Sequence, residues 1–109
     1  MEMSQIKQQF AQVEQSIQQA AKALQSDGTA PQELKDCVRE LDTQSKQAHT
    51  LVEQGDDEEG IQQCIEEMEE IGDRAKDACE EAPKLSPQVK TAVMQAHQKI
   101  SKLKHQLLH

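Results

Sequence analysis

The spacing of its apolar residues constrains what this chain can fold into more than any other sequence feature. In four separate stretches these residues recur at alternating steps of three and four positions, the pattern of a helix that buries one face against partners. The first stretch contains Met3, Ile6, Phe10, Val13, Ile17, Ala20 and Leu24. The pattern predicts an all-α protein.

The amino-acid composition favours helix over sheet for the same chain. Phe10 is the only aromatic residue among 109, and Tyr and Trp are absent, whereas sheets draw on aromatic and β-branched side chains. Glutamine, which favours helix, occurs eighteen times. An all-α fold is therefore strongly favoured over a β-sandwich or β-barrel.

Breaker residues divide the chain into four helices. Gly28 is expected to end the first helix in the left-handed conformation of a C-terminal cap, and Thr29 with Gln32 forms a capping-box pattern for the second. Gly55 and the acidic run that follows separate the second helix from the third, and Ser86 caps the fourth. The expected helices span about residues 2–26, 31–54, 57–82 and 87–108.

Short loops join these four helices, so each must pack antiparallel to the next. The sequence thus predicts a single domain over residues 1–109, folded as an up-down-up-down four-helix bundle. Aligning neighbouring helices across their loops places the apolar residues, with Leu51 among them, in six layers. Five layers are wholly apolar, and either Gln44 or Ser45 puts a polar group into the remaining one.

The charges of the chain are unevenly distributed. Residues 53–81 contain thirteen Asp and Glu against two cations, whereas residues 84–109 contain five Lys and no acid; the net charge is −8. Nucleic-acid binding requires clustered Lys and Arg, and single-strand binding also requires aromatic side chains. We therefore expect no nucleic-acid partner.

The N-terminal sequence and the cysteines predict a cytoplasmic protein without a membrane partner. The N-terminus carries no basic stretch followed by an apolar run, and no apolar run is long enough to cross a bilayer. The three cysteines, Cys37, Cys64 and Cys79, form an odd set without a CxxC pair, which fits reduced thiols better than a disulfide framework.

The sequence offers no pattern typical of catalysis or of a bound cofactor. Its four glycines form no phosphate-binding loop. A carboxyl group acts as a general acid only where burial raises its pKa, and the many carboxylates of this chain fall on the solvent side of the helices. One alternative is metal binding, because His49, Cys64 and His105 fall near one level of the predicted bundle and these residue types are zinc ligands. The simpler interpretation is two surface histidines and a core thiol.

A second alternative involves His49 alone. The tetrapeptide Ala48-His49-Thr50-Leu51 resembles the segment around the phosphorylated histidine of histidine phosphotransfer domains, which are also four-helix bundles. The resemblance implies that His49 would accept the phosphoryl group. Val52 and Glu53 depart from the Lys and Gly that usually follow in that family.

The outer face of the first helix is unusually rich in glutamine. Neutral amides are less strongly hydrated than charged groups, so they enter an interface at lower desolvation cost. The sequence therefore predicts a protein-interaction module of adaptor, chaperone or scaffold type, which binds another protein or itself and has no active site. The predicted partner-binding residues are Gln5, Gln8, Gln12, Gln15 and Gln19.

Overall fold

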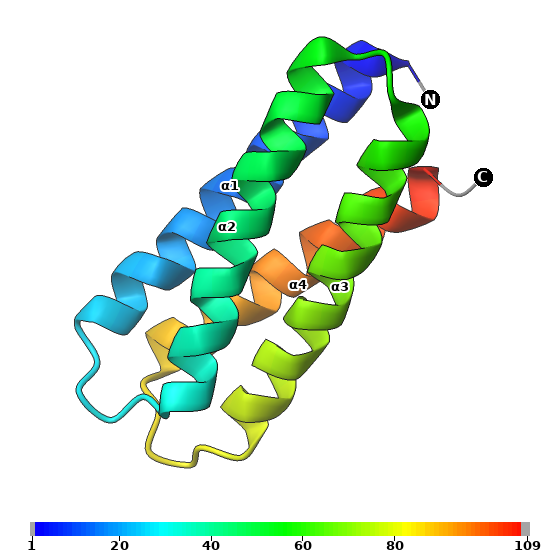
Figure 1. Cartoon of the computed structure of the whole chain (residues 1–109). Helices are drawn as coiled ribbons and strands as arrows, with labels where there is room; N and C mark the ends of the chain where they lie inside the picture. The colour runs from blue at the N-terminus through cyan, green and yellow to red at the C-terminus, as the bar shows by residue number, and fades with distance from the viewer. Residues whose placement is uncertain (1, 108–109) are drawn as a thin grey trace.

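The computed structural model of the chain describes residues 2–107 and contains four helices in that range (Figure 1). They are α1 (Met3–Gln25), α2 (Gln32–Gln54), α3 (Glu58–Glu80) and α4 (Pro87–Leu107). Contacts join α1 to α2, α2 to α3, α3 to α4 and α4 back to α1. The predicted antiparallel four-helix bundle is confirmed, and the predicted helix ends within the described residues differ by at most about two residues. The predicted end of the fourth helix, residue 108, lies outside the described residues.

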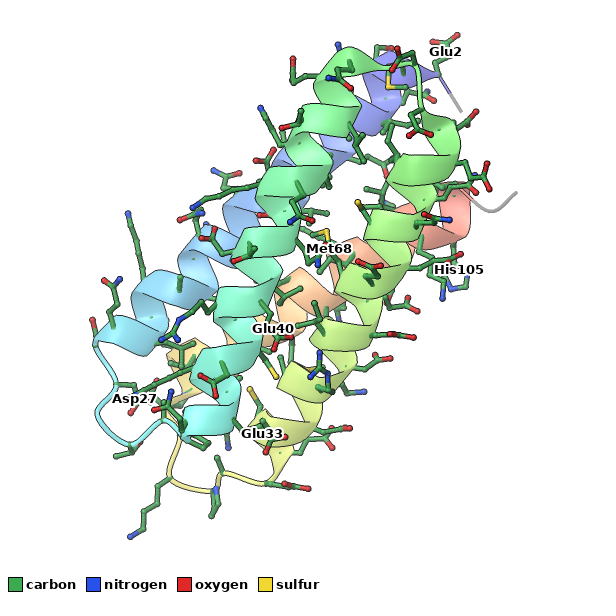
Figure 2. All side chains as sticks on the ribbon, in the orientation of Figure 1. Glu2, Asp27, Glu33, Glu40, Met68 and His105 are labelled. Carbon is green, nitrogen blue, oxygen red and sulfur yellow. The ribbon has the colours of Figure 1, made fainter. Side chains whose placement is uncertain are left out.

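The apolar stripes of all four helices face a common core. Phe10, Ile65 and Met68 are at most 1% exposed, and Figure 2 shows Met68 directed between the helices. One expected core position is wrong: Val52 is buried in α2, whereas the adjacent Leu51 is only half-buried. Both residues satisfy steps of three or four, so spacing alone did not separate them.

Two serines bring polar groups into this core. Ser45 is the buried polar residue of α2, and Ser16 of α1, which the sequence did not indicate, is buried too. Their hydroxyls donate to backbone carbonyls of their own helices, Ser45 to Asp42 at 2.8 Å and Ser16 to Gln12 at 3.0 Å. Each serine is therefore satisfied without a partner on another helix.

The loop after α1 departs from its prediction. Gly28 is not left-handed, because among the described residues only Gly55, at the end of α2, has a positive φ of 71°. The end of α1 is instead capped by Ser26 in a right-handed conformation. The capping box is also wrong: Pro31 is the N-cap of α2, and no side chain caps that end.

A single carboxylate organises the loop in place of Gly28. Asp27 Oδ1 accepts from the backbone N–H of Thr29 at 2.9 Å and from its hydroxyl at 2.6 Å. Asp27 Oδ2 accepts from the backbone N–H of Ser86 at 2.9 Å, in the loop between α3 and α4. The two loops at this end of the bundle, which lie side by side in Figure 1, are therefore joined through Asp27.

These hydrogen bonds make the stability of the fold dependent on pH. Above all the Thr29 hydroxyl, and then the backbone N–H groups of Ser86 and Thr29, lower the pKa of Asp27 from 3.8 to about 2. Because the folded-state pKa is depressed, the contribution of Asp27 is present above pH 3.8 and is lost as the pH falls through about 2.

We expect Asp27→Asn to melt below the wild type at neutral pH, and the difference between their melting temperatures to shrink between about pH 4 and pH 2. Thermal unfolding followed by far-ultraviolet circular dichroism at several pH values measures this. Thr29→Val removes the largest cause of the pKa shift of Asp27. When Thr29→Val is present in both proteins, the difference between their melting temperatures should therefore begin to shrink at a higher pH than it does without this substitution. A difference independent of pH would contradict the assignment.

The other two predicted helix starts are confirmed. Asp57 caps α3, its carboxylate accepting from the backbone N–H of Gly60 at 2.9 Å, and Glu58 and Glu59 occupy the first turn. The hydroxyl of Ser86 accepts from the backbone N–H of Val89 at 3.3 Å at the start of α4. Negative charge beside the N-terminus of α3 accounts for part of the acidic run.

Gly72 lies buried in the interior of α3, where its lack of a side chain costs helix stability. A Cβ atom there would lie 3.5 Å from Cδ2 of His97 and 4.0 Å from Ile100, which are ordinary contact distances. We expect Gly72→Ala to raise the free energy of unfolding by about 0.5–1 kcal/mol, measured by urea denaturation. A decrease would show that α3 and α4 need the glycine for their approach.

Candidate interaction surface

The five glutamines predicted to bind a partner form one line along the outside of α1. Since α1 buries Ile6, Phe10, Val13 and Ile17 at steps of three and four, positions on the opposite face follow the same steps and point to solvent. All five of the predicted glutamines are exposed. Within residues 2–107, none of their side chains makes a hydrogen bond inside the bundle, so their amides are available to another molecule.

The flank of α1 that faces α2 is different, because two of its polar side chains are paired with α2. Gln18 donates to Asp42 at 2.9 Å, and Glu14 lies 3.2 Å from Nδ1 of His49. These pairs join α1 to α2. No such pair joins the outward line of glutamines to another helix in the described residues.

A groove of about 630 Å³ lies between the C-terminal half of α1 and the start of α4. Small side chains on its walls, Ala23 and Ala92 among them, leave this space open. Its lining contains one charged residue, Lys22, and no carboxylate among the described residues. The nine lining residues are Gln19, Lys22, Ala23, Ser26, Pro87, Gln88, Thr91, Ala92 and Gln95. One predicted glutamine, Gln19, thus extends the outward line of α1 into a concave, amide-rich site.

Charge separates the two sides of the bundle. The helix α4 carries four lysines and no acid, whereas α3 carries nine carboxylates and two cations. Lys104 of α4 bonds Glu69 of α3 at 2.7 Å, and Arg74 of α3 bonds Glu40 of α2 at 2.9 Å. The bond from Lys104 holds the pKa of Glu69 below its usual value. The α1–α4 side is therefore the side with few carboxylates.

Comparison with known proteins adds nothing to this geometry. No protein-family model, curated protein or solved structure matches the chain.

The three residues of the hypothetical zinc set do not come together. His49 lies on the α1 flank of α2, where it pairs with Glu14, while His105 is exposed near the end of α4 (Figure 2) and Cys64 is half-buried in α3. Within residues 2–107, no three His, Cys, Asp or Glu side chains lie close enough to hold a metal ion. The prediction was wrong because residues at nearly the same level along a bundle can still point to different sides of it.

The cysteines are placed as core residues and not as nucleophiles. Cys37 and Cys79 are buried, Cys64 is half-buried, and all three are free thiols. Burial raises the pKa of each thiol, that of Cys79 to about 11. Because the thiolate is the reactive form, these side chains are poorly suited to nucleophilic chemistry near neutral pH.

One histidine pair was missed in the sequence. Nε2 of His97 on α4 contacts Oδ1 of Asp73 on α3 at 2.5 Å, and the imidazole is only 17% exposed. The ring lies over Gly72. The alignment of α3 with α4 places residues 73 and 97 at nearly the same level, so that register was the signal that could have found this pair.

A second groove, of about 480 Å³, lies between α1 and α2. Ala21 and Val38 are among its lining residues, and the lining carries both signs of charge, with Lys35 and Arg39 together with Asp27 and Asp42. This mixed charge distinguishes it from the groove beside α4.

None of the helices in residues 2–107 is both long enough and apolar enough to span a membrane.

Proposed function

We propose that this chain is a small protein-interaction module of the adaptor, chaperone or scaffold type, acting in the cytoplasm and without an active site of its own. One observation supports this most strongly: five exposed amides follow the whole outer face of α1 and take no part in holding the bundle together. A surface of neutral amides desolvates at lower cost than the charged surfaces of α2 and α3.

A triple substitution of the glutamine face tests this function. The variant Gln8→Glu, Gln12→Glu and Gln15→Glu keeps the shape of each side chain but adds charge that is costly to bury. We expect proteins captured by the wild type from native lysate, identified by mass spectrometry, to be lost or reduced at least about tenfold with this variant.

The matched control places the same three substitutions elsewhere. Gln47, Gln54 and Gln63 are exposed on α2 and α3, so changing all three to Glu gives the same net charge away from α1. Partners lost with both triple variants would indicate a general charge effect. If no captured protein distinguishes the two variants, and light scattering finds only a monomer, the interaction function is wrong.

His49 supports a second candidate, phosphotransfer. Its side chain is 51% exposed and Nδ1 pairs with Glu14, an arrangement that directs the proton to Nδ1 and leaves Nε2 as the nucleophilic nitrogen. Opposing this, the Glu14 carboxylate repels an incoming phosphoryl group. Incubation with phosphoramidate followed by intact mass measurement tests it: a gain of one phosphoryl group that His49→Gln abolishes would favour phosphotransfer over the interaction module.

A further inference from the structure

We propose that the partner reaches this protein through an acidic segment, rich in Asp and Glu, that lies along the seam between α1 and α4. This inference rests on the proposed interaction function and specifies the chemistry of the partner.

The seam is the part of the surface that repels an acidic segment least. The helix α4 has no carboxylate at all, and the single one within α1, Glu14, lies on the opposite flank against His49. The groove at one end of the seam has no carboxylate in its lining. Every other pair of neighbouring helices includes α2 or α3, which carry most of the acids of a chain whose net charge is −8.

Three lysines supply positive charge along the same seam. Lys22 lines the groove from α1. Lys99 and Lys102 follow the groove residue Gln95 by four and seven positions, so they lie on the same side of α4. Within the described residues none of the three forms an ion pair, in contrast to Lys104, which points to α3 and bonds Glu69.

The glutamines complete the match to carboxylates. Each side-chain amide has two N–H donors, and a carboxylate accepts several hydrogen bonds, so Gln12, Gln15 and Gln19 can bond the oxygens that the lysines attract. Hydrogen bonds with one charged partner are stronger than those between neutral groups. Charge complementarity of this kind also fixes how a partner is oriented, since the same segment turned toward α3 would meet nine carboxylates.

The test is a nuclear magnetic resonance titration of the full ¹⁵N-labelled chain with synthetic peptides. The probe is a 21-residue alanine-based helical peptide with Glu along one face, compared with otherwise identical peptides that carry Gln or Lys there. We expect the Glu peptide to shift backbone amide signals of α1 and α4, to bind at least about fivefold more tightly than the Gln peptide, and to weaken as salt is raised. The Lys peptide should shift α3 instead.

Two triple variants with equal net charge assign the effect to the seam. Changing Lys22, Lys99 and Lys102 to Gln should weaken binding of the Glu peptide at least about fivefold. Changing Lys35, Lys46 and Lys76, which lie on α2 and α3, to Gln should change it less than about twofold. Equal losses, shifts outside α1 and α4, or equal binding of the Glu and Gln peptides would overturn the proposal.

Self-association gives a further outcome, because α3 of a second copy is itself acidic. Sedimentation of the chain alone should show a monomer, since two copies each carry −8; a dimer dissociated by the seam variant would identify a second copy as the occupant and overturn the proposal. If the glutamine substitutions abolish capture while the lysine substitutions leave peptide binding unchanged, the interaction function stands and the acidic partner is wrong. If neither the glutamine nor the lysine substitutions have any effect, both the interaction function and the acidic partner are wrong.

Discussion

Truncating Phe10 to alanine is expected to lower the free energy of unfolding by about 3–5 kcal/mol, the usual cost of removing a buried aromatic ring. Phe10 is 1% exposed and is among the largest fully buried side chains of the bundle. Total stabilities of small domains are about 5–15 kcal/mol, so this one change should remove a large part of the margin. Urea denaturation followed by far-ultraviolet circular dichroism measures it, because the chain has no Trp for fluorescence.

Two further variants show whether the loss comes from a cavity. Phe10→Leu keeps most of the apolar volume and should cost less than about 1.5 kcal/mol. Gln15→Ala truncates an exposed side chain of the same helix and should stay within about 0.5 kcal/mol of the wild type. If Phe10→Ala cost no more than Gln15→Ala, the core position assigned to Phe10 would be wrong.

The helices could be predicted from the sequence because the same signal is repeated many times along each of them. Every turn of α1 adds another apolar residue at a step of three or four, so errors at single positions do not change the result. The cap at Ser86 and the acidic start of α3 were equally predictable, since each depends on residues within one helical turn. These features are determined by interactions between residues close together in the sequence, so the sequence is enough to predict them.

The loop after α1 could not be predicted in the same way. Gly28 and Thr29 have the local chemistry of a helix cap, but Asp27 bonds Ser86, which lies 59 residues further along the chain. This contact becomes possible only once the two loops lie together at one end of the bundle. Local propensity was therefore outweighed by a tertiary hydrogen bond.

Part of the candidate site could likewise be predicted from local sequence, and part of it depends on tertiary contacts. The exposure of the glutamines on α1 followed from the buried stripe, because the face opposite a core stripe is solvent-exposed. The groove beside α4 did not follow, since it depends on how closely two helices approach around short side chains such as Ala23 and Ala92. The flank on which His49 lies also needed the structure, because a level in a bundle does not specify a direction around it.

The small residues of the core should be as intolerant of change as the large ones. Ala75 in α3 is fully buried, beside the buried Gly72, Ala78 and Cys79 of the same helix. We expect Ala75→Leu to lower the free energy of unfolding by about 1–3 kcal/mol, because added methylene groups in a close-packed core force strained side chains and shifts of the backbone. Urea denaturation measures this.

The same substitution at Ala11 provides the control, since Ala11 is exposed on α1 and Ala and Leu differ little in helix propensity. Ala11→Leu should therefore change the free energy of unfolding by less than about 0.5 kcal/mol. The difference between the two variants measures packing alone. If Ala75→Leu were neutral or stabilising, the core beside α3 would contain a cavity large enough for the added methylene groups. The core would then not be close-packed, and the assignment of function to the surface, which depends on a close-packed core, would be wrong.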